Sequence, residues 1–156
     1  MRPSLETLRV VVPSFLILVS ACRKEPETVF VPGKAFKHVV EVKTAQGMTA
    51  NVRVGEWLTL YGQRSTGPWI AVERKRLGAD GCWVAPPPPE EEPQVADNLK
   101  WNSEPTSNAE FNPGLLPDHS RQVRFKAPGP YVLHALSPTW CSSPARSNEI
   151  TVVVVE

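Results

Sequence analysis

Three cysteines carry the most distinctive chemistry in this sequence, and the surroundings of Cys22 point to one use of its thiol. A basic start that contains Arg2 is followed by an apolar run over residues 10–19 and then by two small residues. This order is typical of a secretory signal, and a run of about ten residues is about half of what a membrane-spanning helix needs. We therefore expect residues 1–21 to be an export signal; a short buried or membrane-spanning helix is the alternative.

The five residues Leu18-Val19-Ser20-Ala21-Cys22 resemble the lipobox of bacterial lipoproteins. The resemblance implies that the Cys22 thiol is linked to a diacylglycerol, that the preceding peptide is removed, and that the new amino terminus is acylated, commonly with palmitate. Two or more acyl chains hold a protein stably on a bilayer. Arg23 follows the cysteine, and the sorting rule of this family then favours the outer membrane or the cell surface over the inner membrane.

The other two cysteines, Cys82 and Cys141, are suited to one intramolecular disulfide, because compartments beyond the inner membrane permit such bonds. A bridge between them closes a loop of about 60 residues and is worth about 4 kcal/mol in the chain-entropy model. Two separate free thiols are the alternative. The cysteines lie far apart, and the three histidines show no ligand-like spacing, so we expect no metal site.

Three tryptophans are candidate ligand-binding residues: Trp69, Trp83 and Trp140. Trp83 follows Cys82 and Trp140 precedes Cys141, so the proposed bridge would bring both rings together. Exposed rings on such a surface suit stacking on a sugar or anchoring a protein partner. The alternative is that the rings cover the disulfide and form a small satellite core.

Other function classes find little support in the sequence. There is no nucleophile elbow, no glycine-rich phosphate loop and no His-Glu-x-x-His helix, so we expect neither an enzyme nor a cofactor. The signal holds two of the 17 basic and one of the 16 acidic residues, so the mature chain is formally neutral. A neutral chain without a basic patch is not expected to bind nucleic acid.

Apolar residues alternate with polar ones in short runs over most of the mature chain, and 17 prolines and nine glycines separate these runs. Period-two alternation with β-branched and aromatic residues predicts strands. An all-β chain of this size suggests a two-sheet sandwich of about seven strands. The expected strands lie at residues 38–43, 52–54, 57–61, 99–102, 123–125, 131–135 and 149–156.

The C-terminal third resembles the ending of bacterial immunoglobulin-like domains. Pro128-Gly129-Pro130-Tyr131 precedes one expected strand, and the valine-rich run 150–154 closes the chain. The resemblance implies that Tyr131 is a corner tyrosine bonded to nearby backbone and that Trp101 is the core tryptophan. Leu133 stands where antibody domains have a cysteine, so aliphatic packing is expected to replace that bridge.

This interpretation divides the chain into a signal (1–21), a lipidated tether (22–35) and an immunoglobulin-like domain (36–156). The domain carries a long insertion at 64–98 between the second and third strands of the immunoglobulin plan, which are the expected strands at 57–61 and 99–102. The proline run 86–89 in that insertion is expected to be a stiff spacer or, alternatively, a ligand for a proline-recognising partner. The resemblances imply a non-catalytic binding, adhesion or structural accessory on the cell envelope, with a protein or glycan partner.

Overall fold

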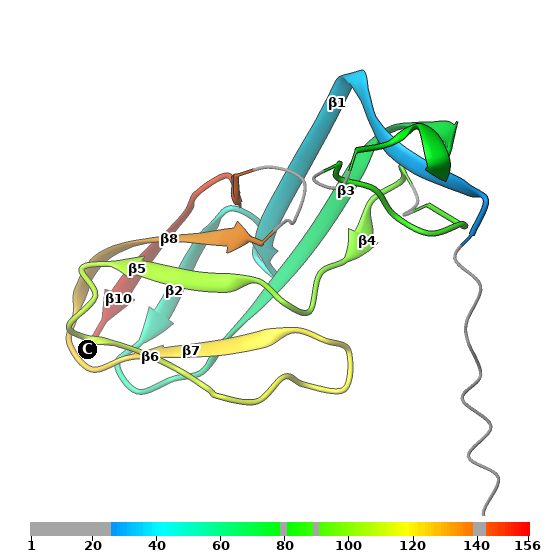
Figure 1. The fold of residues 1–156 in the computed structure, drawn as a ribbon. Coiled ribbons are helices and arrows are strands. Elements are labelled where there is room, and N and C mark those ends of the chain that lie inside the picture. The colour runs from blue at the N-terminus through cyan, green and yellow to red at the C-terminus, as the bar shows by residue number, and fades with distance from the viewer. Residues whose placement is uncertain (1–25, 79–80, 89–90, 139–142) are drawn as a thin grey trace, which may run out of the picture.

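The structure, a computed structural model, describes residues 26–78, 81–88, 91–138 and 143–156 (Figure 1). In this part of the chain the regular elements are strands, apart from one 3-10 turn, η1, at Arg74–Arg76. The strands are β1 (Thr28–Thr44), β2 (Thr49–Arg53), β3 (Leu58–Glu73), β4 (Gln94–Val95), β5 (Lys100–Glu104), β6 (Ala109–Phe111), β7 (Arg121–Phe125), β8 (Gly129–Ser137), β9 (Ala145–Arg146) and β10 (Ile150–Val155).

Two sheets pack face to face. The first has the order β1-β3-β7-β6, with β4 on β3, and the second has the order β2-β10-β8-β5, with β9 on β8. All pairs are antiparallel except β2 with β10, which is parallel. The first order matches strands A, B, E and D of an immunoglobulin domain, and β10-β8-β5 matches G, F and C. The predicted all-β, immunoglobulin-like sandwich is confirmed.

The core forms where the inner faces of the two sheets meet, and the alternation seen in the sequence decides which residues enter it. On β10, for example, Ile150, Val152 and Val154 are buried while the residues between them are exposed. Leu58, Leu60 and Leu133 belong to the same buried cluster, so aliphatic packing occupies the place of the antibody bridge. The other buried members are Val40, Val42, Ala50, Val52, Ala96, Leu99, Val123, Phe125, Tyr131 and Ala135.

The predicted tyrosine corner is present at the start of β8. The Tyr131 hydroxyl donates a hydrogen bond of 2.9 Å to the carbonyl oxygen of Ala127, and the ring is 2% exposed. Gly129 has a φ of 138°, a conformation that residues with a Cβ rarely adopt. Trp101 packs against the core from β5 but stays partly exposed, so its role is that of a border residue rather than a central one.

Two predicted boundaries are wrong, because β1 and β3 are longer than expected. β1 begins at Thr28, inside the predicted tether 22–35, and β3 continues to Glu73, inside the predicted insertion 64–98. The sequence 28–31 pairs with 70–73, and both stretches are rich in residues that favour strands. Prolines and glycines in these stretches interrupt the alternation that would have predicted the pairing. In the structure they are accommodated at one irregularity, where the register shifts between Pro32 and Lys37.

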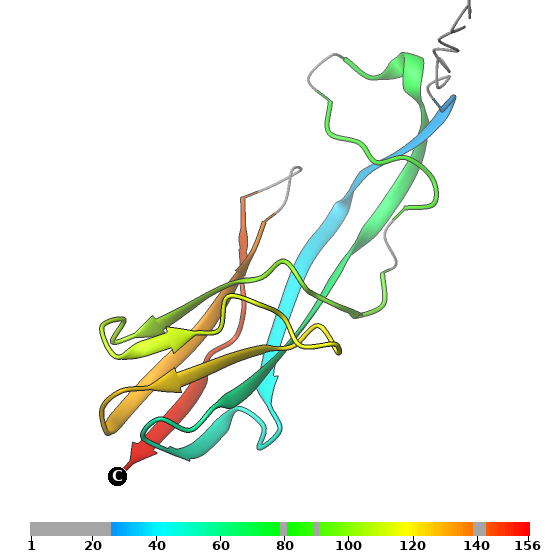
Figure 2. The ribbon, with the colours of Figure 1, turned by 90° about the horizontal axis from the view of Figure 1, so that it is seen from below.

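The extended ends of β1 and β3 leave the sandwich as a two-stranded ribbon, which Figures 1 and 2 show projecting away from the C-terminus. We call residues 28–37, 66–78 and 81–88 the arm. The segment after η1 folds back onto the ribbon, and Phe30 and Val84 exchange two backbone hydrogen bonds of 3.0 and 2.9 Å. Val29 and Val84 are buried there, outside the sandwich cluster.

Candidate ligand-binding site

Polar side chains gather on the outer face of the first sheet, opposite the core. Because Leu58 and Leu60 face inward on β3, Tyr61 and Gln63 face outward at the next odd positions. Lys43 lies directly across from Tyr61 in the register of β1 and β3. Directly opposite residues on one face of an antiparallel pair have neighbouring side chains, so this cluster is built by the register itself.

Two adjoining hollows open over this cluster, with volumes of about 650 and about 570 Å³. Both are lined by Lys43, Gly47, Tyr61 and Gln63. The first also reaches Val95 of β4 and the loop at Asp118, His119 and Ser120. The second reaches Val39, Met48 and Asn148.

The polar groups of the shared lining are available to a ligand. Among the residues that the structure describes, none forms a hydrogen bond or ion pair with the side chains of Lys43, Tyr61 or Gln63. An ammonium, a phenol and a carboxamide offer donors, acceptors and an aromatic face. Hydrogen-bonding groups and an aromatic face set beside a hollow suit the binding of a polar ligand.

The rim of the first hollow carries a fixed carboxylate. Asp118 Oδ1 accepts a hydrogen bond of 3.1 Å from the Ser120 amide and a second from its hydroxyl. These hydrogen bonds favour the charged form and lower the pKa of Asp118 below its usual value. His119 beside it is exposed and has a φ of 64°, so the loop turns sharply at the rim.

The rim of the second hollow is tied to the other sheet by Asn148. Its side-chain Oδ1 accepts a hydrogen bond of 2.8 Å from the Val42 amide, and its Nδ2 donates one of 2.9 Å to the Val42 carbonyl oxygen. A carboxamide thus takes the place of a neighbouring strand at this point of the β1 edge. These two hydrogen bonds fix β1, and with it Lys43, relative to β10.

Two of the predicted tryptophans lie in the arm, away from these hollows. The Trp69 ring packs edge-on against Phe36 at 4.8 Å and an interplanar angle of 73°. The Arg74 guanidinium lies 4.8 Å from the centre of the Trp83 ring. Both tryptophans are half-buried, so each ring already has a protein neighbour on part of its surface.

The remaining predicted site residues, Cys22, Trp140 and Cys141, lie outside the described residues. The lipidation of Cys22, the pairing of Cys82 with Cys141 and the meeting of Trp83 with Trp140 therefore stay predictions. Cys82 itself is in the arm, next to Trp83.

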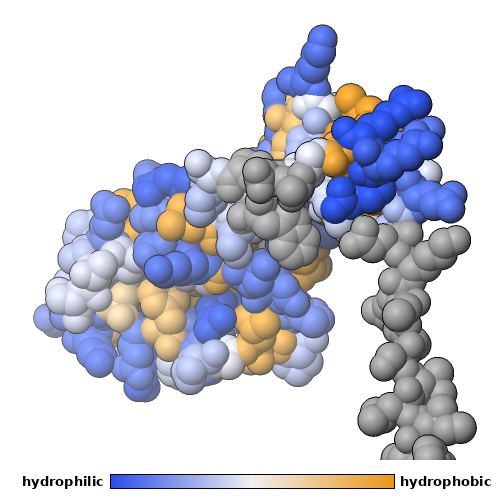
Figure 3. All heavy atoms as spheres, viewed as in Figure 1, coloured by the Kyte–Doolittle hydropathy of each residue, from blue (hydrophilic) through white to orange (hydrophobic). Residues whose placement is uncertain are grey.

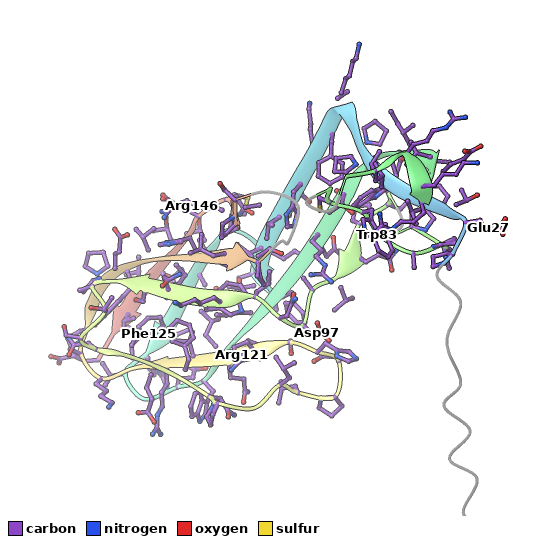
Figure 4. All side chains as sticks on the ribbon, viewed as in Figure 1. Glu27, Trp83, Asp97, Arg121, Phe125 and Arg146 are labelled. Atoms are coloured by element: carbon purple, nitrogen blue, oxygen red, sulfur yellow. The ribbon has the colours of Figure 1, made fainter. Side chains whose placement is uncertain are left out.

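Two histidines are partly or fully buried, and three of their four ring nitrogens have no hydrogen-bond partner among the described residues. In the part of the chain that the structure describes, neither ring nitrogen of His38 has a hydrogen-bond partner, and burial together with the nearby Arg64 lowers the pKa of His38. His134 is 6% exposed, and its Nε2 lies 2.8 Å from Nη1 of Arg146, which Figure 4 labels on β9. No group of three or more metal-ligating side chains occurs in the described part of the chain.

The described residues contain no helix that is long and apolar enough to cross a membrane. Comparison of the chain with protein-family models, with curated proteins and with solved structures finds no match.

Proposed function

We propose that this chain is a lipid-anchored, non-catalytic immunoglobulin-like binding module of a bacterial envelope, placed at the outer membrane or cell surface. Acylated Cys22 holds it on the bilayer, and an envelope protein or glycan binds non-covalently over Tyr61. The proposed anchor is supported by the signal over residues 1–21 and the lipobox that ends at Cys22.

The observation that carries the proposed binding role is the convergence of Lys43, Tyr61 and Gln63 on two adjoining hollows. Polar side chains that are not used within the fold, set on rigid strands beside a hollow, are the usual makings of a binding site. The neutral chain and the mixed lining favour a polar, uncharged or mixed-charge partner over nucleic acid.

Binding through the tryptophans is the second candidate. Half-burial of Trp69 against Phe36 and of Trp83 beneath Arg74 instead supports their role as a satellite core in the arm. For this reason we place the binding site at the hollows over Tyr61 rather than at the tryptophans. A sugar or peptidoglycan is one of the two partner classes that we propose for these hollows.

The anchor is tested by intact-mass analysis and radiolabelled palmitate incorporation. We expect the wild-type chain to lose residues 1–21 and gain acyl mass, and Cys22→Ala to incorporate no palmitate. A wild-type chain that retains its first 21 residues without acyl mass would contradict the proposed anchor.

The binding role is tested by peptidoglycan pull-down, glycan arrays and cross-linking in intact envelopes. We expect Tyr61→Ala and Gln63→Ala to weaken binding at least tenfold, because each removes a group from both hollows. Thr151→Ala, an exposed change on the outer face of β10, is the matched control and should keep full binding. Loss of binding with Trp83→Ala but not with Tyr61→Ala would favour the tryptophan site instead.

A further inference from the structure

The arm ends in a charged tip, and that tip is the part of the fold nearest in sequence to Cys22. Thr28 pairs with Glu73 there, and the Arg74 amide donates a hydrogen bond of 2.9 Å to the carbonyl oxygen of Glu27. Figure 4 shows Glu27 and Trp83 at this same end. We propose that the arm tip lies against the headgroups of the bilayer that holds Cys22, with Lys75 and Arg76 facing anionic phosphates.

Chain length limits how far the tip can stand from the lipid. Five residues separate Cys22 from Thr28, and even a fully extended chain of that length spans only about 20 Å. The inference rests on the proposed acylation of Cys22. Given that anchor, the tip cannot leave the surface layer by more than this distance.

The shape of the molecule keeps the sandwich on the far side of the tip. β3 runs without a break from Leu58 in the core to Glu73 at the tip, and 16 residues of strand span about 50 Å when straight. The Gly55 amide, just before β3, bonds the Phe125 carbonyl oxygen at 2.9 Å, so the β7–β8 turn lies at the opposite end. Figures 1 and 2 place the C-terminus at that end too.

The side chains of the tip suit an anionic bilayer surface. Those of Lys75 and Arg76 are 82% and 73% exposed, although both also approach Glu73, at 3.3 and 3.1 Å. With Arg74 and Glu27, the described tip carries three basic and two acidic groups. Hydrophilic residues gather there in Figure 3. Lysine and arginine beside a tryptophan, here Trp83, are typical of the membrane–water interface.

The experiment uses the full-length acylated protein, in detergent and in vesicles of phosphatidylcholine with phosphatidylglycerol. A water-soluble amine reagent and mass spectrometry report the labelling of Lys75 at the tip and of Lys126, whose side chain is 62% exposed at the opposite end. We expect vesicles to reduce Lys75 labelling at least threefold and to leave Lys126 labelling unchanged.

Charge reversal sharpens the test. Arg76→Glu should restore at least half of the lost Lys75 labelling, whereas Arg53→Glu, an exposed change in β2 at the sandwich end, should not. Acylated protein whose Lys75 is labelled equally in detergent and vesicles would overturn the proposed contact alone. Protein that carries no acyl mass would instead overturn the anchor from which the contact follows.

Discussion

The sandwich and the arm share two strands but are held together in different ways. In the sandwich, residues from both sheets bury a continuous cluster that includes Leu60, Phe125 and Leu133. In the arm, a two-stranded ribbon is covered by one folded-back segment, and its buried aliphatic residues are Val29 and Val84. An isolated two-stranded ribbon is marginally stable in water, so the covering segment is needed to keep the arm formed.

One strand can therefore belong to two units of unequal stability. The sandwich parts of β1 and β3 are expected to open only with the whole domain, whereas their arm parts can open locally. A Cys82–Cys141 bridge would join the covering segment of the arm to the loop between β8 and β9. Changes at the bridge, in the core, in the arm, at the corner tyrosine or in the pH should therefore affect the two regions to different extents.

The largest effect is expected from Cys82→Ser. Loss of the proposed bridge frees a loop of about 60 residues in the unfolded chain and should lower the free energy of unfolding by about 4 kcal/mol. Urea denaturation measures the change. Reduction of the wild-type protein should reproduce it, and an unchanged midpoint in both experiments would show that the two cysteines are not paired.

Leu133→Ala is expected to destabilise the sandwich by about 3 kcal/mol, because the side chain is fully buried at the centre of β8. Circular dichroism in urea should show the loss as a shift of the main unfolding transition. Leu115→Ala, a change of the same chemistry at a residue that is 40% exposed, should leave the midpoint nearly unchanged. Equal effects of the two substitutions would contradict the position of the core.

Sequence patterns predicted the sandwich well and the arm poorly, and the reason is physical. Alternation is clear where one face of a strand is buried, so Ile150, Val152 and Val154 could be placed in the core from sequence alone. In the arm, burial comes from a segment more than ten residues away, and prolines interrupt the pattern at Pro32. No local signal connects Phe30 with Val84.

The hollows over Tyr61 were missed for a similar reason. The alternation that puts Leu58 and Leu60 inside also puts Tyr61 outside, so one half of the signal was available in the sequence. The other half, the approach of Lys43 and of the Asp118 loop, depends on the β1–β3 register and on the loop before β7. Such pairings join distant parts of the chain and have no period to detect.

Val84→Ala should affect the arm and spare the sandwich. Removing two buried carbons costs about 1–2 kcal/mol of local stability. Hydrogen exchange should therefore become about tenfold faster at the Phe30 and Val84 amides, which bond each other's carbonyl oxygens. The Leu133 amide on β8 should exchange at its wild-type rate; acceleration there as well would show that arm and sandwich unfold as one unit.

Tyr131→Phe should cost about 1 kcal/mol, because it removes the hydrogen bond to Ala127 while keeping the buried ring. The measurement is the urea midpoint of the main transition. Tyr61→Phe is the matched control: its hydroxyl has no partner among the described residues, so its loss should leave stability unchanged. Equal midpoints for the two variants would show that the corner hydrogen bond makes no measurable contribution to stability.

The smallest effect concerns pH at His38, which lies where the arm meets the sandwich and pairs with Thr66. Burial and the nearby Arg64 lower its pKa in the folded state, so the unfolded state binds a proton first as the pH falls. The neutral His38 ring therefore makes its full contribution to the stability of the folded state above the unfolded pKa of about 6.5. This contribution declines as the pH falls from there toward the folded pKa.

Hydrogen exchange at the arm amides between pH 7.5 and about 5, corrected for the intrinsic rate, tests this expectation. Arm protection should fall with pH in the wild-type protein and should vary less in His38→Gln, which cannot titrate. His119→Gln, at an exposed loop residue, should behave as the wild type does. If His38→Gln and the wild type lose protection in parallel, a group other than His38 makes the base of the arm sensitive to acid, and the boundary between the two regions must be sought elsewhere along β1.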